Sequence, residues 1–290
     1  MEDRDWLIIK LLYERKSITK TAQALFMTQP TLTTRIRQIE EDLGVKIMYR
    51  NNKGVKFTLE GEYLAECAHN MLTAAREIRD KVTNMGNEVK GTLRIGASIY
   101  VTRYILPRLL RRFQDLYPRA EFRVITTSSQ DIFSLMHTQD THVGFVRGDY
   151  GWRDEQYLLF EEPMCIASKH PLVLSDLPRL PRIDYHTDHL NKLSLDTWWT
   201  EKFTVPPHIS MLVNQVDICK DMVLNGLGYA ILPSMMLTDV QHIYKTYITD
   251  KQGRPLIRRT LMLYQKEALE TQLVHAFVEF VKTIDFNNPN

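Results

Sequence analysis

Apolar residues recur at helical spacing in the first part of the chain and predict three helices. The first lies within residues 4–16, where the apolar positions are Trp6, Ile9, Leu12 and Tyr13. The second lies within residues 18–25, and Ser17 is suited to cap its start. A connection of three residues leads to the third, whose buried stripe is expected to be Leu32, Ile36, Ile39 and Leu43. Two short helices joined by a tight turn indicate a helix-turn-helix.

The third helix has an unusually polar outward face at its start. Thr28 is a suitable cap, and Pro30 fits the first turn because its missing N–H is not needed there. The outward residues are Gln29, Pro30, Thr33, Thr34, Arg37 and Gln38. Gln can read adenine, Thr can contact a thymine methyl group or a phosphate, and Arg can reach guanine or phosphate. The face is therefore suited to the major groove of DNA, although a solvated surface helix would show the same pattern.

Alternating apolar and polar residues after Gly44 predict a β-hairpin. Its strands are expected within residues 45–50 and 54–58, and Asn51-Asn52-Lys53-Gly54 has the composition of a turn. The hairpin carries Arg50, Lys53 and Lys56. A basic two-stranded wing after a helix-turn-helix predicts a winged-helix domain that spans residues 1–58.

A heptad repeat follows this domain. Its apolar positions alternate spacings of three and four residues: Leu64, Ala68, Met71, Ala75, Ile78, Val82 and Met85. Thr58 is suited to cap a helix that runs to about Asn87. We expect this stripe to pair with a second copy of the chain, although an ordinary core helix, with Leu72 widening the stripe, would look similar.

Strands and helices alternate from residue 91 to the end of the chain, which predicts an α/β domain with a parallel, doubly wound sheet. Helices are expected within residues 103–118, 131–138 and 217–225 and near the C-terminus, through Leu273, Phe277, Phe280 and Ile284. The expected strands lie within residues 91–98, 120–129, 142–148, 164–172, 180–186, 209–214, 229–233 and 256–265.

Hydroxyl side chains follow the first two of these strands. Ser98, Tyr100 and Thr102 follow the first strand, and Thr127, Ser128 and Ser129 follow the second. Ligands of open α/β sheets lie beyond the carboxyl ends of strands, where helix N-termini supply free N–H groups. The hydroxyls would suit a small carboxylate, a sulfate-like ion or another polar ligand, but Ser and Thr are also common helix caps. Tyr185 and Asn214 are weaker candidates from the later half.

Composition and charge change this picture little. The chain has 290 residues, enough for two or three domains, and 44% of them are hydrophobic. It shows no long apolar run and no signal-like N-terminus, and its three cysteines, Cys67, Cys165 and Cys219, are far apart, so we expect a cytoplasmic protein with reduced thiols. The net charge is +2, and the first 58 residues carry +4, a modest indication of nucleic-acid binding.

Candidate catalytic and metal-binding residues are few. No Gly-x-Ser-x-Gly, Walker-type, Gly-x-Gly-x-x-Gly or His-Glu-x-x-His motif occurs. The run His186–His189 lacks a third ligand and is better explained as a polar loop. Glu161, Glu162 and Asp217 are interpreted as solvated or capping residues, and the Trp198-Trp199 pair as core or interface. We therefore expect no catalytic site, no metal and no cofactor.

Residues 17–64 closely resemble the N-terminal module of the LysR-type transcriptional regulators. The matching positions are Ser17, Ala22, Leu25, Gln29-Pro30, Glu40, Leu43-Gly44, Arg50, Thr58 and Gly61. The departures are Thr21 for an Ala, Thr28 and Thr33 for serines, Met48 for a Phe, and Thr34 where Arg is frequent. The later half is also similar to the effector-binding domain of that family, through the segments at 91–96, 105–118 and 222–233.

The resemblance implies an architecture. Residues 1–58 would form the DNA-binding domain, 59–90 the dimerising linker helix of an antiparallel coiled coil, and 91–290 an effector domain similar to type II periplasmic binding proteins. Lobe I of that domain would span about 91–161 and 260–290, and lobe II about 162–259. The crossovers between lobes would lie near Glu161-Glu162 and Arg258–Leu261.

The resemblance also implies a function, that of a regulator whose promoter binding responds to a small-molecule effector. The outward residues of the third helix would enter the major groove, whereas Thr28, Arg35, Arg50 and Lys53 would hold phosphates. The chain would act as a dimer or a dimer of dimers, with RNA polymerase as a further candidate partner and no membrane contact. An intracellular solute-binding protein with an accessory helix-turn-helix is the alternative, and an enzyme would need a catalytic constellation that the sequence lacks.

Overall fold

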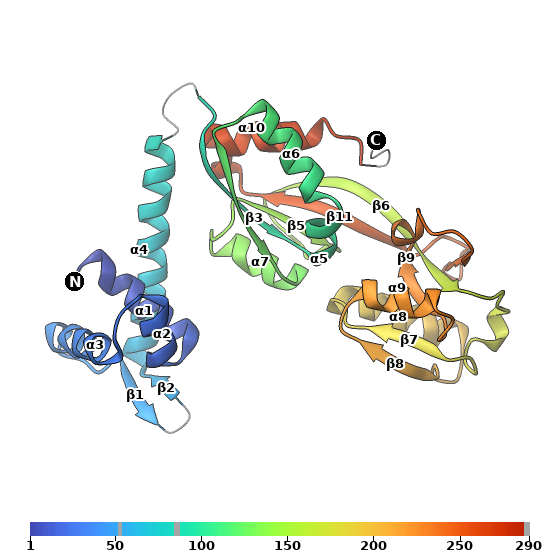
Figure 1. Cartoon of the computed structure of the whole chain (residues 1–290), viewed down its shortest axis with the longest axis horizontal. Helices are drawn as coiled ribbons and strands as arrows, with labels where there is room; N and C mark the ends of the chain where they lie inside the picture. The colour runs from blue at the N-terminus through green and yellow to red at the C-terminus, as the bar shows by residue number, and fades with distance from the viewer. Residues whose placement is uncertain (52–53, 84–87, 287–290) are drawn as a thin grey trace. The chain divides into compact units, whose positions relative to one another are not determined.

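The computed structural model describes residues 1–51, 54–83 and 88–286. The chain divides into two compact units, Met1–Gly86 and Asn87–Asn290, which Figure 1 shows in blue to cyan and in green to red. Each unit has its own hydrophobic core. Among the described residues, none of the helices has both the length and the apolar character needed to cross a membrane.

Three helices form the core of the N-terminal unit: α1 (Asp3–Arg15), α2 (Ile18–Ala24) and α3 (Gln29–Leu43). They bury Ile8, Ile9, Leu12, Leu32, Ile36 and Ile39 almost completely. Ser17 and Thr28 accept the capping N–H bonds expected at the starts of α2 and α3. Leu43, expected in the buried stripe, is 39% exposed, because it is the last residue before the left-handed Gly44 ends the helix.

The wing consists of β1 (Met48–Asn51) and β2 (Gly54–Phe57), which pair antiparallel. The Val55 N–H donates to the carbonyl of Lys16 at 2.9 Å, so the wing is tied to the end of α1. Glu40 of α3 supports the approach to β1, since its Oε1 accepts the N–H of Ile47 at 3.0 Å and its Oε2 accepts Lys46 Nζ at 2.6 Å. The middle of the predicted turn, Asn52 and Lys53, lies outside the described residues.

The long helix α4 (Leu59–Thr83) begins where Thr58 Oγ1 accepts the N–H of Gly61 at 3.0 Å. Met71, Ala75, Ile78 and Val82 of the heptad stripe are exposed, and Leu64 is partly buried. Ala68 is wholly buried by the core of its own unit, so the expectation that it contacts a partner helix is wrong. Met85 and the predicted helix end near Asn87 lie outside the described residues.

Lobe I of the C-terminal unit is built on β3 (Gly91–Ala97), β4 (Ala120–Thr126) and β5 (Val143–Arg147). These three strands are parallel, with β3 in the middle. β11 (Ile257–Tyr264) extends the sheet antiparallel to β5, and β6 (Glu155–Ser168) pairs antiparallel with the other edge of β11. The sheet is therefore mixed, and the expected all-parallel arrangement is wrong, because β11 lies between β5 and β6 and runs antiparallel to both.

Helices cover both faces of this sheet. On one face, the core contains residues of α5 (Ile99–Tyr104), α6 (Leu106–Leu116) and α10 (Gln272–Lys282). On the other, α7 (Ser129–His137) packs its Ile132 and Met136 against β5 and β11. The helix expected across residues 103–118 is interrupted at Ile105, because Pro107 lacks the N–H that a continuous helix would donate to the carbonyl of Arg103.

Lobe II contains β7 (Arg182–Tyr185), β8 (Ile209–Val213), β9 (Ala230–Pro233) and β10 (Tyr244–Tyr247). β9 and β10 both pair with the second half of β6, and β7 pairs parallel with β8. α9 (Val216–Leu224) packs in one core cluster, and α8 (His189–Lys202) packs in the other through the buried Trp198 and Trp199. The sequence did not predict α8, and His189, expected in a loop, is its first residue.

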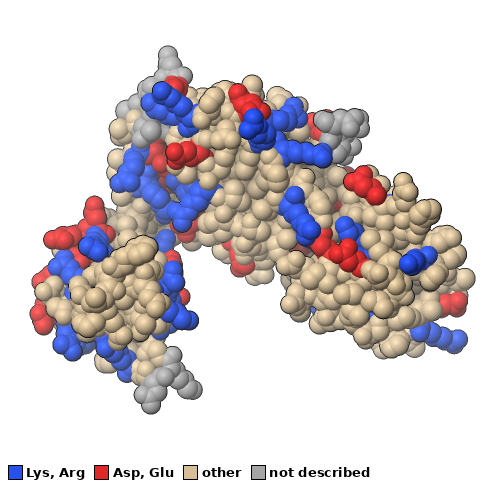
Figure 2. Space-filling view, viewed as in Figure 1, with Lys and Arg blue, Asp and Glu red and all other residues tan. Residues whose placement is uncertain are grey.

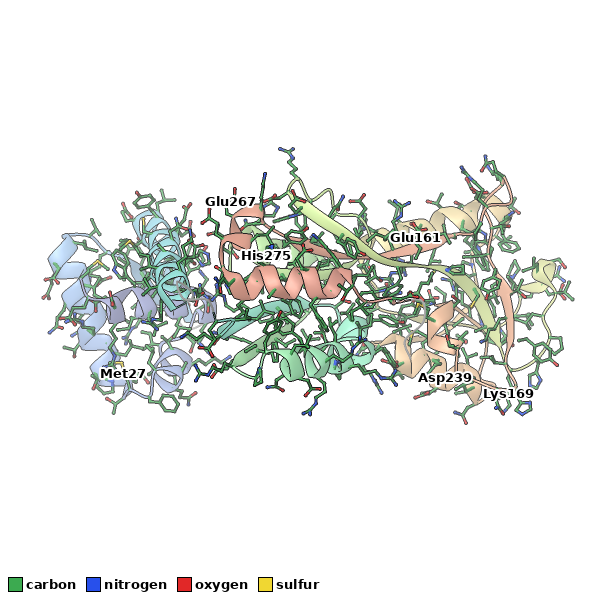
Figure 3. All side chains as sticks on the ribbon, turned by 90° about the horizontal axis from the view of Figure 1, so that it is seen from above. Met27, Glu161, Lys169, Asp239, Glu267 and His275 are labelled. Atoms are coloured by element: carbon green, nitrogen blue, oxygen red, sulfur yellow. The ribbon has the colours of Figure 1, made fainter. Side chains whose placement is uncertain are left out.

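The two lobes share two continuous strands. β6 runs without a break from lobe I into lobe II, and Glu161 lies midway along it (Figure 3). β11 pairs with β6 from Ile257 to Tyr264, beside the same midpoint. The crossovers expected near Glu161-Glu162 and Arg258–Leu261 therefore lie on a pair of hydrogen-bonded strands, and the end of β5 adjoins them.

Candidate functional site

The outward face of α3 is open. Gln29, Pro30, Thr34, Arg37 and Gln38 are exposed, and Thr33 is half-buried. Several of these residues border a shallow hollow of about 550 Å³ between α3 and the start of α1. Leu32, Ile36 and Ile39 on the opposite side are at most 1% exposed, so the helix is anchored by its apolar stripe and presents its polar stripe.

Arg35 is held inside the N-terminal unit. Its Nε and Nη2 donate to the two carboxylate oxygens of Asp5 at 2.6 and 2.9 Å, and its Nη1 donates to Gln38 at 3.3 Å. Burial by itself would raise the pKa of Asp5, but hydrogen bonds from Arg35 and from the Glu2 N–H, with the charge of Arg35, bring that pKa below its ordinary value. Asp5 also closes a capping box at the start of α1. The predicted phosphate contact by Arg35 thus competes with this bidentate pair.

We expect Asp5→Asn to destabilise the N-terminal unit by about 1–3 kcal/mol, because it leaves a half-buried guanidinium without its partner. Since the pKa of Asp5 is depressed, its contribution is present above the unfolded pKa and is lost as the pH falls through the folded pKa. Hydrogen exchange of the α1 and α3 amides at pH 7 measures the loss. Asp3→Asn, an exposed change in the same turn, is the control, and equal exchange in both variants would contradict the role of the pair.

The wing presents basic residues next to α3. Arg50 Nη2 donates to Thr33 Oγ1 at 2.6 Å, which links β1 to the outward face of α3. Lys16 Nζ lies 3.3 Å from the centroid of the Tyr13 ring, so this ammonium group makes a cation–π contact within the unit. Lys and Arg side chains lie along the margin of the N-terminal unit in Figure 2, with acidic residues gathered at one side.

In the C-terminal unit, a buried ion pair lies where the lobes meet. Arg147, the last residue of β5, is 3% exposed, and Glu162 of β6 is 1% exposed. Arg147 Nη2 donates to Glu162 Oε1, and Glu162 Oε2 accepts the N–H of Met235 at 3.1 Å. Met235 lies in the 3₁₀ turn Ser234–Leu237 directly after β9, so Glu162 connects the end of β5 to the end of a lobe II strand.

A second ion pair lies beside the first. Arg258 of β11 donates to the carboxylate of Asp188, which caps α8 by accepting the N–H of Asn191 at 2.9 Å. The side chains of Arg258 and Asp188 are 11% and 7% exposed. Asp188 lies in the loop before α8, within the predicted polar loop, but its side chain is buried. Glu162 was expected to be solvated or capping, and this is wrong, because its carboxylate is buried against Arg147.

Six buried polar side-chain atoms in this region have no hydrogen bond of normal geometry. We call them the interlobe cluster: Ser98 Oγ, Arg147 Nε, Tyr150 OH, Tyr185 OH, Arg258 Nε and Thr260 Oγ1. Thr260 pairs with Arg147 in the sheet, and the Ser98 N–H donates to Phe145 next to it. Buried polar groups are nearly always satisfied in proteins, so this concentration of unsatisfied ones makes the region the candidate ligand site of the C-terminal unit.

The charges of the cluster act on one another. Burial, followed by the positive charge of Arg258, lowers the pKa of Arg147 to about 10 despite Glu162. Burial, followed by the charge of Asp188, raises the pKa of Tyr150 to about 12. Burial likewise raises the pKa of Tyr185, and both arginines oppose that rise. The tyrosines are thus neutral hydroxyls near pH 7, available as hydrogen-bond donors.

The predicted effector residues divide into two groups. Ser98, Tyr100, Ser129 and Tyr185 are in or beside the cluster: Arg147 stacks over the Tyr100 ring at 4.1 Å, and its N–H donates to Ser129 Oγ at 3.0 Å. The remaining four point elsewhere, which departs from the expectation of a shared site. Thr127 and Ser128 both donate to Asp131 at 2.8 Å, Thr102 bonds to Ala97 and Thr126, and Asn214 is exposed.

Tyr185 also borders a pocket of about 210 Å³ between β7 and α8. Its walls combine the apolar Leu195, Leu212 and Ile231 with charged side chains, those of Arg182, Asp184, Lys192 and Asp196. Elsewhere on the lobe boundary, Asp217 of α9 accepts Arg103 Nη1 at 3.1 Å and the hydroxyl of Tyr104, both from α5. Asp217, expected to be solvated or capping, is therefore a further contact between lobes.

Sequence reasoning missed the charged members of the site: Arg147, Glu162, Asp188 and Arg258. A signal existed for Arg147, because a charged residue ends an otherwise apolar strand just before Gly148. The described residues contain no group of three or more His, Cys, Asp or Glu side chains arranged to hold a metal ion.

Two family models match this chain, one over each of its two compact units. Residues 4–62 match the model of bacterial regulatory helix-turn-helix proteins of the lysR family, and residues 86–284 match the LysR substrate binding domain. The chain is 38% identical over 282 residues to the uncharacterized HTH-type transcriptional regulator YraN of Bacillus subtilis (strain 168), covering 97% of this chain and 98% of that one. It is 30% identical to YkuM of the same strain, over the full length of both.

A solved structure shows the same fold. Full-length CbnR complexed with its target DNA superposes with a TM-score of 0.66 at 19% sequence identity, covering 98% of this chain and 99% of CbnR. Both domain models match this chain in order, and the relatives are transcriptional regulators rather than enzymes. The chain belongs to the LysR family of transcriptional regulators.

Proposed function

We propose that residues 1–58 bind promoter DNA, residues 59–90 pair two copies of the chain, and residues 91–290 bind a small-molecule effector between two lobes. The open face of α3 supports the first part, since it combines exposed hydroxyl, amide and guanidinium groups on a firmly anchored helix. Gln29, Pro30, Thr33, Thr34, Arg37 and Gln38 are the residues that we propose enter the major groove. Thr28, Arg50 and Lys53 would hold phosphates. Arg35 would contact a phosphate only if its ion pair with Asp5 broke.

The exposed stripe of α4 supports pairing. Met71, Ile78 and Val82 are 54%, 64% and 59% exposed, and they lie at heptad spacing on a helix that continues beyond its contact with α1. A helix of a single chain rarely leaves such a stripe in water, because pairing would bury it. We propose that Leu64, Met71, Ala75, Ile78, Val82 and Met85 contact the partner helix, in a dimer or a dimer of dimers.

Ile78→Gln is expected to shift the chain toward monomer, with a dissociation constant raised at least about tenfold, because two buried isoleucines are lost per dimer. Glu77→Gln, on the neighbouring position off the stripe, is the matched control. Light scattering on a dilution series measures the mass. An unchanged dimer in the Ile78→Gln variant would show that α4 does not hold the two copies together.

The effector part rests on the interlobe cluster. Its unsatisfied donors come from β5, β7 and β11 and from the segments after β3 and β5, so a ligand there would contact both lobes at once. A ligand that prefers one arrangement of the lobes shifts the equilibrium between arrangements. The shift would reach the DNA-binding units through the paired α4 helices. Because binding free energies are linked, DNA would in turn change the affinity for the effector by the same factor.

A regulator of this kind works where promoter DNA is found. We therefore place it in the cytoplasm, with promoter DNA, a second copy of itself, a small-molecule effector and RNA polymerase as its partners. Selection of genomic fragments by the purified chain, against random competitor and with or without a metabolite extract, tests the proposal. We expect a few promoter fragments to be enriched and the enrichment to change with the extract. Enrichment no better than that of competitor DNA would contradict it.

A further inference from the structure

Every atom of the interlobe cluster can donate a hydrogen bond. The Nε atoms of Arg147 and Arg258 can do nothing else, because a guanidinium has no acceptor. The hydroxyls of the other four members can each donate one hydrogen as well. A ligand among them must therefore present several acceptor oxygens, since a ligand rich in N–H groups would leave both arginines unsatisfied.

The charge balance of the cluster favours one negative charge over two. Glu162 and Asp188 already contact the two arginines, so the four groups sum to zero. Each carboxylate nevertheless reaches only an Nη2 atom and leaves Nε unused. A monoanion can accept from both Nε atoms and relieve the repulsion between the two cations, whereas a dianion would bury a second uncompensated charge beside Glu162 and Asp188.

The space next to the cluster suits an organic group. Aromatic rings adjoin the cluster: the Tyr100 ring stacks against the guanidinium of Arg147, and Tyr150 and Tyr185 carry two of the cluster's hydroxyls. A carboxylate offers planar acceptors that match the arginine edge, and its carbon part can lie against these aromatic rings, which sulfate or phosphate would not use.

We propose that the interlobe cluster binds a small monocarboxylate, with its oxygens on Arg147 and Arg258 and its carbon part against the neighbouring tyrosine rings. This inference rests on the proposed effector site and names the class of its ligand. Because all six atoms are inaccessible, entry requires the lobes to separate about β6 and β11, and closure then surrounds the carboxylate.

Thermal unfolding of the full chain tests the class of ligand. Formate, acetate and benzoate are each compared with the matching primary amide, and with sulfate and inorganic phosphate, at constant pH and ionic strength. We expect at least one carboxylate to raise the unfolding midpoint of the C-terminal unit by about 3–6 °C at ten times its Kd. The amides, sulfate and phosphate should give no such rise.

Neighbouring arginines on β11 provide the matched pair of variants. Arg258→Gln removes a cluster member, whereas Arg259→Gln alters a residue that is 58% exposed and pairs with Glu161 outside the cluster. The carboxylate shift should disappear in the first and persist in the second. Tyr185→Phe keeps the charges and the packing and removes one hydroxyl, and it should weaken carboxylate binding about 5–10-fold.

The proposal is overturned if no carboxylate raises the midpoint, if an amide, sulfate or phosphate does so as well, or if Arg258→Gln and Tyr185→Phe bind carboxylate as the native chain does. DNA binding separates this failure from that of the proposed function. A carboxylate that binds through Arg258 but leaves DNA binding unchanged would retain the ligand class and remove the effector role. A neutral metabolite that alters DNA binding would support the effector role and contradict the proposed ligand class.

Discussion

Glu162→Gln is expected to lower the free energy of unfolding of the C-terminal unit by about 3–5 kcal/mol, because it leaves the buried Arg147 uncompensated. The amide keeps the shape of the side chain but not its charge. It must also satisfy both Arg147 and the N–H of Met235, and an amide has only one oxygen to offer them. Arg258 makes the loss worse, since its charge already opposes that of Arg147.

Glu161→Gln is the matched control for this change. Glu161 is the preceding residue on β6, its side chain is 41% exposed, and it pairs with the exposed Arg259. Exposed pairs contribute about 0–1 kcal/mol, so this variant should unfold almost as the native chain does. Urea unfolding followed by tryptophan fluorescence measures both, since Trp152, Trp198 and Trp199 lie in this unit. Similar losses in the two variants would show that burial of the pair is not what matters.

Replacing both partners gives a further check. The double variant Arg147→Met, Glu162→Leu removes both buried charges and fills their place with apolar side chains of similar size. It should recover most of the stability lost in Glu162→Gln, because the main cost is an unpaired buried charge rather than a missing bond.

Gly61→Ala is expected to destabilise the N-terminal unit by about 3 kcal/mol or more and to abolish DNA binding. An added Cβ would lie 1.9 Å from the carbonyl oxygen of Ile47 and 2.9 Å from the Phe57 ring, so α4 would have to move away from the wing. Helix propensity alone predicts the opposite, a gain of about 1 kcal/mol for Ala within a helix. The sign of the effect therefore distinguishes the close contact from propensity.

Gly44→Ala is the control for this prediction. Gly44 has φ of +68°, and nothing lies within 4 Å of the Cβ that Ala would add, so the cost is only that of a left-handed backbone, about 1–2 kcal/mol. Hydrogen exchange of α3 and binding to a selected promoter fragment are measured for both variants. A Gly61→Ala chain that exchanges and binds as the native chain does would refute the contact.

Periodicity along the sequence predicted the elements of the N-terminal unit well, because each signal is local. The stripe Leu32, Ile36 and Ile39, the caps at Ser17 and Thr28, and the left-handed Gly44 all depend on neighbours within a few residues. Ala68 shows what periodicity alone cannot predict. A heptad position indicates an apolar surface, but it does not indicate whether this surface packs in the unit's own core or against a second copy of the chain.

The candidate site in the C-terminal unit was harder to predict, because its groups are distant in sequence. Arg147, Asp188 and Arg258 lie 41 to 111 residues apart and meet only once β5, β6 and β11 are paired. Hydroxyls after strands could be found from the order of elements, which is why Ser98 and Ser129 were identified. The arginines gave no periodic signal, and strand direction, which made the sheet mixed, also depends on long-range pairing.

The central claim is that the outward face of α3 contacts DNA, and equilibrium binding of three variants to a selected promoter fragment tests it most directly. Gln29→Ala should lose about 1–3 kcal/mol of preference for that fragment over random duplex. Arg37→Ala should weaken binding to the fragment, and Gln130→Ala, the same kind of change on the exposed surface of α7, should do neither. If Gln29→Ala and Arg37→Ala bind the fragment as tightly and as selectively as Gln130→Ala does, the claim is contradicted.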